Sequence, residues 1–277
     1  MSPVRSDEAD LTRKERREQA RSQRKALEQA EASRAVRRTR LTQLGIVVAV
    51  VVVAIVAVLI ASGGSSKSGG PAKPGSPPSN ATIAEVNSLV GKLPESGNTL
   101  GSPSAPVTLQ YFADLECPIC KDFTLGALPS LIQHWVATGK LRIEYRNMQT
   151  ATRETEIFRT QQVAALAAGK QNKLWPFVEI FYHEQGEEGS GYVTEQYLQN
   201  IAQQVPGLNL AAWTAARGET SLTAQLTTDA QLANTSGFTG TPSFLVGKTG
   251  GAAKKLEYAS LTDPASFNAA IEKALKA

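Results

Sequence analysis

The stretch "DLECPICKDF", residues 114–123, holds the only two cysteines of this 277-residue chain, Cys117 and Cys120. It follows "VTLQYF", residues 107–112, whose β-branched and aromatic side chains predict a buried strand. A helix is expected to begin at the cysteines, because Pro118 suits a first helical turn, where its missing N–H costs nothing. The sequence therefore predicts a strand followed directly by a helix that carries a cysteine pair at its start.

This position has a chemical consequence for the two thiols. The first sulfur would face unpaired backbone N–H groups and the positive end of the helix dipole, which favour a thiolate over a thiol. The second sulfur would lie one turn further in and be less exposed. This division suits Cys117 as the attacking nucleophile and Cys120 as the resolving thiol, exchanging disulfides through a mixed-disulfide intermediate.

Two other uses of the pair compete with disulfide exchange. A static disulfide would close so short a loop that it would add only about 1–2 kcal/mol of stability. A closed zinc site needs four ligands, and only His134 and His183 remain to complete one. His134 would lie about 21 Å further along the same helix if that helix were straight. We therefore expect neither a metal nor a cofactor.

The remaining periodicity predicts a mixed α/β fold. Leucines spaced by three and four, ending at Trp135, continue the first helix, with a kink or break expected at Pro129. Two parallel strands joined by a crossover, together with an antiparallel hairpin, would form one mixed sheet. The later elements expected are a strand from Leu141, an inserted helical block over 153–236, a hairpin of "PSFLVG" and "KLEYA", and a last helix with Asp263 as N-cap and Pro264 in its first turn.

The N-terminal part of the chain has a different composition. Residues 1–40 hold 12 Lys+Arg and 7 Asp+Glu, whereas residues 81–277 hold 15 and 18, which argues against a nucleic-acid-binding surface in the larger part. Residues 44–61, "LGIVVAVVVVAIVAVLIA", would span about 27 Å as a helix, close to the roughly 30 Å of a bilayer core. A cleaved signal peptide is the alternative, but its apolar region is usually about 7–15 residues after a short basic start. We expect an uncleaved single-pass membrane anchor.

The charges around this span predict its orientation. Arg37, Arg38 and Arg40 precede it, and only Lys67 and Lys73 follow within twenty residues, which places the N-terminus in the cytoplasm. The expected organisation is a basic cytoplasmic arm (1–43), the transmembrane anchor (44–61), a flexible Ser-, Gly- and Pro-rich linker (62–80) and an extracytoplasmic domain (81–277). Outside the cytosol a cysteine pair can remain oxidised.

A second motif completes the pattern. "GFTGTPSFLVG", residues 237–247, places Thr241 and Pro242 before a strand. With strand-"CPIC"-helix upstream and "GTPSF" downstream, residues from about 95 to 277 resemble the DsbA-like branch of the thioredoxin superfamily, including its helical insertion. The resemblance implies that Cys117 attacks, that Cys120 resolves, and that a cis-proline loop at Thr241-Pro242 receives the substrate. Pro118 matches the proline frequent between the cysteines of this family.

The chain departs from the family pattern near the cysteines. Ile119 stands where the best-known oxidase has a histidine that stabilises the thiolate, and Tyr111 stands where many relatives carry a buried acid. Asp114 and Glu116 would oppose thiolate formation if they approached the sulfur. These differences imply a centre less oxidising than the strongest oxidase.

The function implied is therefore that of a membrane-tethered thiol:disulfide oxidoreductase acting on cysteines of exported proteins, with oxidation favoured over reduction. The resemblance also implies a quinone-linked membrane protein that reoxidises the pair. A disulfide reductase or isomerase, and a non-catalytic thioredoxin-like module that binds peptides, remain as alternatives.

Overall fold

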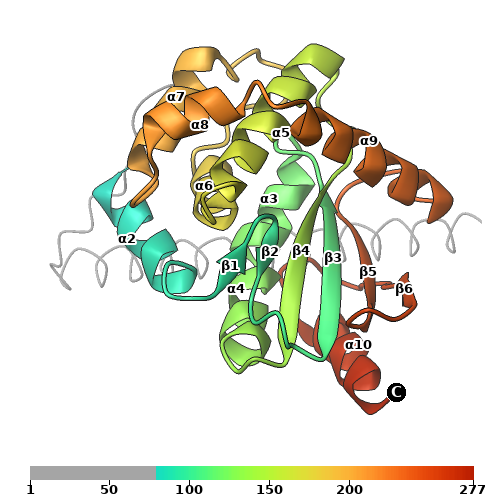
Figure 1. The fold of residues 1–277 in the computed structure, drawn as a ribbon. Helices are drawn as coiled ribbons and strands as arrows, with labels where there is room; N and C mark the ends of the chain where they lie inside the picture. The colour runs from blue at the N-terminus through green and yellow to red at the C-terminus, as the bar shows by residue number, and fades with distance from the viewer. Residues whose placement is uncertain (1–78) are drawn as a thin grey trace, which may run out of the picture. The chain divides into compact units, whose positions relative to one another are not determined.

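The computed structural model describes residues 79–277, which form a mixed sheet with helices packed around it (Figure 1). The strand order is β1-β2-β4-β3-β5-β6, in which β3 and β4 are parallel and the other neighbours antiparallel. The strands are β1 (Glu95–Ser96), β2 (Thr99–Leu100), β3 (Val107–Ala113), β4 (Leu141–Asn147), β5 (Ser243–Lys248) and β6 (Ala253–Lys255).

Five of the helices in the described residues lie in the long segment between β4 and β5. This segment holds α5 to α9, seen above the sheet in Figure 1, and it confirms the inserted helical block. The helices are α2 (Asn80–Leu89), α3 (Pro118–Leu125), α4 (Ala127–Leu131), the π-helical turn η1 (Ile132–Val136), α5 (Thr155–Gly169), α6 (Leu174–His183), α7 (Glu195–Gln204), α8 (Leu210–Ala216), α9 (Thr220–Thr235) and α10 (Ala265–Lys276).

The central strand β3 is covered on both faces. On one face α3 and α10 meet over the sheet at the ring of Phe244 in β5. The centroid of this ring lies 4.7 Å from that of Phe123 in α3 and 5.0 Å from that of Phe267 in α10. On the other face Phe112 belongs to a small apolar cluster with Ala233 of α9. Cover on both faces leaves every residue of β3 buried except the half-buried Gln110.

The first helix breaks in the turn that precedes Pro129, as the sequence predicts. The break is at Gly126, with φ −101° and ψ −91°, whereas Pro129 lies in the first turn of α4, where a missing N–H is harmless. A Cβ at residue 126 would stand 2.4 Å from the carbonyl oxygen of Asp122 and 2.9 Å from that of Leu261. The prediction of a break at Pro129 is therefore confirmed, and the structure adds that a side chain would not fit at the glycine where the two helices meet.

Two elements differ from the prediction. The second hairpin strand is Ala253–Lys255, which overlaps "KLEYA" only at Lys255 and forms an exposed edge of the sheet. Helix α10 begins at Ala265 with Pro264 at its N-cap, although Asp263 Oδ1 still accepts the Ala265 N–H at 2.9 Å. Helix α2 and the β1–β2 hairpin were not predicted.

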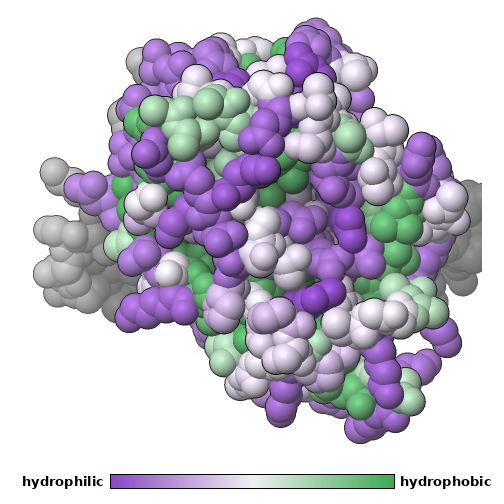
Figure 2. Space-filling model, in the orientation of Figure 1, coloured by the Kyte–Doolittle hydropathy of each residue, from purple (hydrophilic) through white to green (hydrophobic). Residues whose placement is uncertain are grey.

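The surface of this domain is mixed in character. Hydrophilic residues predominate on the face in Figure 2, and hydrophobic residues form small scattered patches among them. Within residues 79–277 no helix is both long and apolar enough to cross a membrane. The predicted arm and anchor, and all but the last two residues of the predicted linker, lie outside the described part of the chain.

Candidate active site

Cys117 is the N-cap residue of α3. Its backbone is extended (φ −73°, ψ 116°), Pro118 follows in the first turn, and its sulfur accepts the Cys120 N–H at 3.4 Å. The parallel strand β3 ends at Ala113, so the turn of residues 114–116 delivers the sulfur to the carboxyl end of the sheet. This is the geometry that the sequence predicted for the first cysteine.

The two thiols, both unbridged in this structure, have opposite environments. Cys117 is 5% exposed and Cys120 is fully buried. A hydrogen bond with the Cys120 thiol is the largest of the effects that lower the pKa of Cys117 to about 6, aided by Thr241 and the N–H groups of Cys120 and Ile119 and opposed by burial. Burial raises the pKa of Cys120 well above its ordinary value. At neutral pH the outer sulfur is thus a thiolate and the inner one a thiol.

The cis-proline loop lies against the outer sulfur. The Thr241–Pro242 peptide bond is cis, and the Cys117 sulfur lies 3.4 Å from the Thr241 carbonyl oxygen, to which it donates in its protonated form. The hydroxyl of Tyr258, a residue 36% exposed, donates to the Pro242 carbonyl oxygen at 3.2 Å. The fold therefore brings together the two motifs, which are 124 residues apart in the sequence.

The Asp114 carboxylate is hydrogen-bonded to the loop after β4 and to the turn before α3. Its Oδ2 accepts the backbone N–H groups of Thr150, Ala151 and Thr152 at 2.9–3.0 Å, and its Oδ1 accepts the Thr152 hydroxyl and the Glu116 N–H. Five donors thus stabilise this buried charge, and it joins the loop after β4 to the turn before α3. The Thr150 hydroxyl in turn bonds to that of Thr241, so the same loop contacts the cis-proline segment.

Gln185, which follows α6, was not found by the sequence reasoning. Its side-chain amide donates to the carbonyl oxygens of Leu115 at 2.7 Å and Cys117 at 3.1 Å. It therefore ties the helical insertion directly to the turn that carries the nucleophile. A glutamine after a helix has no sequence signal for such a contact, because the partners are backbone atoms 68 to 70 residues away.

The two residues that depart from the family pattern take different places. Tyr111, fully buried in β3, donates to the Cys120 carbonyl oxygen at 3.2 Å and shares a 3.1 Å hydrogen bond with the Thr124 hydroxyl. Ile119 is 46% exposed beside the cysteines, so it offers an apolar surface to whatever binds there.

The histidines lie apart from the cysteines. His134 is exposed on η1 and His183 is half-buried at the end of α6. Among residues 79–277, no group of three or more His, Cys, Asp or Glu is placed to hold a metal ion.

Comparison with known proteins places this fold. A family model described as Thioredoxin matches residues 94–273. The chain belongs to this thioredoxin family. The region matched runs from β1 to α10 and includes both the cysteine pair and the cis-proline loop.

Curated relatives of this thioredoxin-family chain include disulfide bond formation proteins. It is 26% identical over 112 residues to the probable disulfide bond formation protein D of Bacillus anthracis, covering 38% of this chain and 48% of that one. It is 26% identical over 108 residues to the disulfide bond formation protein D of Bacillus subtilis, covering 37% and 46%. The chain spans about half the length of the curated relatives it matches.

Solved structures share the fold over a longer range. BdbD from Bacillus subtilis, in oxidised form, matches with a TM-score of 0.56 at 21% identity, covering 73% of this chain and 97% of that one. Alpha-DsbA1 from Wolbachia pipientis matches with a TM-score of 0.54 at 21% identity, covering 67% and 94%. These likenesses confirm the DsbA-like thioredoxin fold with its inserted helices.

Proposed function

We propose that this protein is a membrane-tethered, extracytoplasmic thiol:disulfide oxidoreductase that oxidises cysteines of exported proteins. The observation that carries the proposal is the Cys117 sulfur, which caps α3, has its pKa lowered to about 6 and lies 3.4 Å from the cis-proline loop. The thioredoxin family and the relatives named disulfide bond formation proteins support the same activity.

The reaction begins with a disulfide between Cys117 and Cys120. A client thiolate attacks Cys117, the more accessible sulfur, forming a mixed disulfide and releasing Cys120, which takes up a proton because burial raises its pKa. A second client thiolate then attacks the client sulfur of the mixed disulfide and releases Cys117 as a stabilised thiolate. Two electrons pass from the client dithiol to the pair, and the client gains one disulfide.

The substrate would lie along the cis-proline loop. The Thr241 and Pro242 backbone borders the outer sulfur, and Ile119 adds an exposed apolar side chain beside it. Pro118 fixes the first turn of α3 and with it the direction of the Cys117 sulfur. An extended client segment next to this loop would present its cysteine to the thiolate.

Tethering follows from the sequence of the N-terminal part. The apolar span at 44–61, with the basic arm before it, would anchor the chain with its domain outside the cytoplasm. Repeated oxidation also requires an acceptor for the two electrons left on the cysteine pair. A quinone-linked membrane protein is our proposed acceptor, and a membrane anchor would keep the two close together.

The test is to trap the client. In a Cys120→Ser variant the Cys117 thiolate can still attack the disulfide of an oxidised client, the reverse of the second step, and no Cys120 thiol is present to release the client. Clients should therefore remain disulfide-linked to Cys117 and appear as reducible adducts on gels and by mass spectrometry. A Cys117→Ser variant is the matched control and should trap none. Absence of adducts with Cys120→Ser, together with no exchange between the wild-type pair and glutathione, would refute the proposal.

Two alternatives make different predictions. A non-catalytic peptide-binding module would keep its full biological activity when both cysteines are replaced by serine, whereas the oxidoreductase would behave as a deletion. A reductase or isomerase would need a pair that is held reduced. The exposed Ile119 supplies no charge to the thiolate, which favours a more reducing pair, and a measured reduction potential decides the direction of electron flow between the pair and its client.

A further inference from the structure

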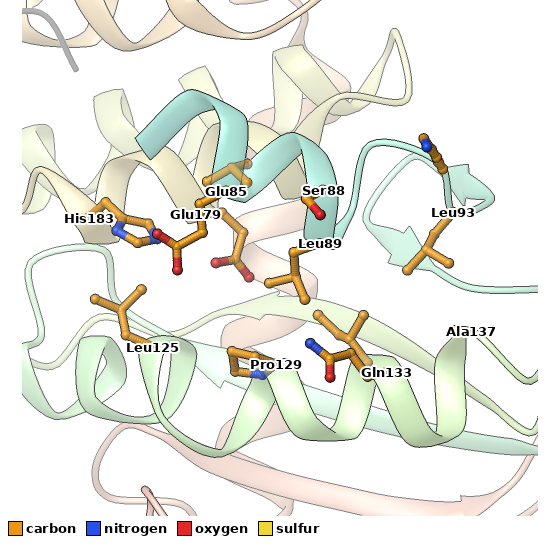
Figure 3. A pocket seen from close by; sticks show the side chains of 13 residues that line it. Glu85, Ser88, Leu89, Leu93, Leu125, Pro129, Gln133, Ala137, Glu179 and His183 are labelled. Atoms are coloured by element: carbon orange, nitrogen blue, oxygen red, sulfur yellow. The ribbon is translucent and has the colours of Figure 1, made fainter. Parts of the chain in front are cut away.

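A cavity of about 400 Å³ lies on the domain apart from the cysteine pair and the cis-proline loop. Figure 3 shows it between α2 and α6 on one side and the helices α3, α4 and η1 on the other. Neither cysteine and no residue of the cis-proline loop lines it. The cavity is therefore separate from the proposed redox chemistry.

The most unusual group in this cavity is the carboxyl of Glu179. Its side chain is fully buried in α6, and neither of its oxygens has a hydrogen-bond partner among the described residues. Burial, with a smaller effect from Glu85, raises the pKa of Glu179 to about 8. A buried polar group without a partner costs about 1–3 kcal/mol, and a ligand that supplied the missing partner would recover this free energy.

The groups around Glu179 do not compensate for it. In Figure 3 the carboxylates of Glu85 and Glu179 both extend into the space between the two helical layers, and His183 lies beside them. Burial lowers the pKa of His183, which favours its neutral form. Lys92 lies at the rim, but no ion pair links it to either carboxyl in the part of the chain described. The site thus has two acids and no cation between them.

The walls indicate what kind of cation would fit. Most of the lining is aliphatic, and a bare metal ion would leave these walls uncovered. A ligand with a positive head and an aliphatic stem would cover the walls and neutralise the acids together. The aliphatic lining residues are Val86, Leu89, Leu93, Leu125, Pro129, Ile132 and Ala137.

We propose that this cavity binds a primary alkylammonium group, with its nitrogen between the carboxyls of Glu179 and Glu85 and its alkyl stem along the α4 wall. The group can belong to a free polyamine or to a lysine side chain of a bound protein. Binding adds a ligand site to the proposed oxidoreductase and needs neither cysteine.

The test uses the full-length chain in detergent with two probes, 1,5-diaminopentane and N-acetyl-lysine amide, titrated by calorimetry. We expect both to bind, and Glu179→Gln, which keeps the shape but not the charge, to weaken binding at least tenfold. Glu272→Gln, an exposed acid on α10 outside the cavity, is the matched control and should bind as the wild type does. Circular dichroism verifies that each variant is folded.

The ionisation of Glu179 gives a second readout. An ammonium favours the carboxylate, so binding below pH 8 should release a proton, and the measured heat should depend on the ionisation enthalpy of the buffer. Binding should also tighten as pH rises from 6 to 8, because Glu179 loses its proton over this range and burial lowers the pKa of His183, which favours its neutral form.

The outcomes separate the possibilities. Binding by both probes supports the ammonium site, and stronger binding by one of them identifies the source. Equal binding by wild type and Glu179→Gln, or binding of Mg²⁺ or Ca²⁺ without binding of either amine, would overturn the proposal. A Cys117→Ser, Cys120→Ser variant should bind the amines normally, so failure here leaves the redox proposal untouched.

Discussion

The lowered pKa of Cys117 makes the stability of the reduced protein depend on pH. Its pKa falls from an ordinary 9.0 to about 6, roughly three units at about 1.4 kcal/mol each, which sets a ceiling near 4 kcal/mol. Because water reaches the outer sulfur and screens its interactions, we expect about half of this, roughly 2 kcal/mol. A depressed pKa gives stability that is complete above pH 9 and lost as the pH falls to 6.

The measurement compares urea unfolding of the reduced wild type and Cys117→Ser, both as full-length chains in detergent, at intervals from pH 5 to 9. Serine does not titrate in this range, and Cys120 contributes to both proteins, so the difference between them isolates the Cys117 thiolate. We expect the free energy of unfolding of the wild type, relative to the variant, to rise by about 2 kcal/mol between pH 6 and 9. A difference that is constant across this range would refute the reasoning.

Three further substitutions test the structure around the site. Replacing Gln185 with Leu removes two hydrogen bonds to backbone carbonyls and should lower the free energy of unfolding by about 1–3 kcal/mol. The control Gln199→Leu, on the exposed face of α7, should change it by less than about 0.5 kcal/mol, and equal losses would contradict the contact. Ile119→His adds a positive partner for the thiolate, so it should raise the reduction potential by about 30 mV for each unit by which the pKa of Cys117 falls, measured against glutathione. No rise would show that residue 119 does not tune the centre. Gly126→Ala forces a Cβ to 2.4 Å from a backbone oxygen and should cost about 1–3 kcal/mol of stability. Gly218→Ala, whose Cβ would have its nearest contact at 3.5 Å, should not cost this stability, and thermal unfolding of the two variants compares them.

The parts of the site that sequence alone predicts are those carried by contiguous residues. The strand before the cysteines is a β-branched run, and Pro118 marks the start of α3, so the N-cap position of Cys117 follows from local rules. The "GTPSF" motif identified the second half of the site through resemblance. The structure adds that the two halves lie in contact at the Cys117 sulfur.

The remaining features depend on contacts between distant segments. The close approach of Leu261 to Gly126 joins segments 135 residues apart, and the orientation of Asp114 follows from three N–H groups in the loop after β4. The strands of the β1–β2 hairpin have two residues each, too few for periodicity to reveal. Glu179 is visible in the sequence as an acid on an apolar helix, but its burial depends on the helices that cover it.

The reduction potential of the Cys117–Cys120 pair tests the central claim most directly. A nucleophile with a pKa of about 6 lies between thioredoxin, at about 7, and the strongest oxidase, at about 3.5. Interpolating their potentials of about −270 and −120 mV predicts a value near −230 mV in glutathione redox buffers. A value in that region would support an oxidising disulfide exchanger. A pair that does not exchange with glutathione, or one with a potential at or below that of thioredoxin, would contradict the account.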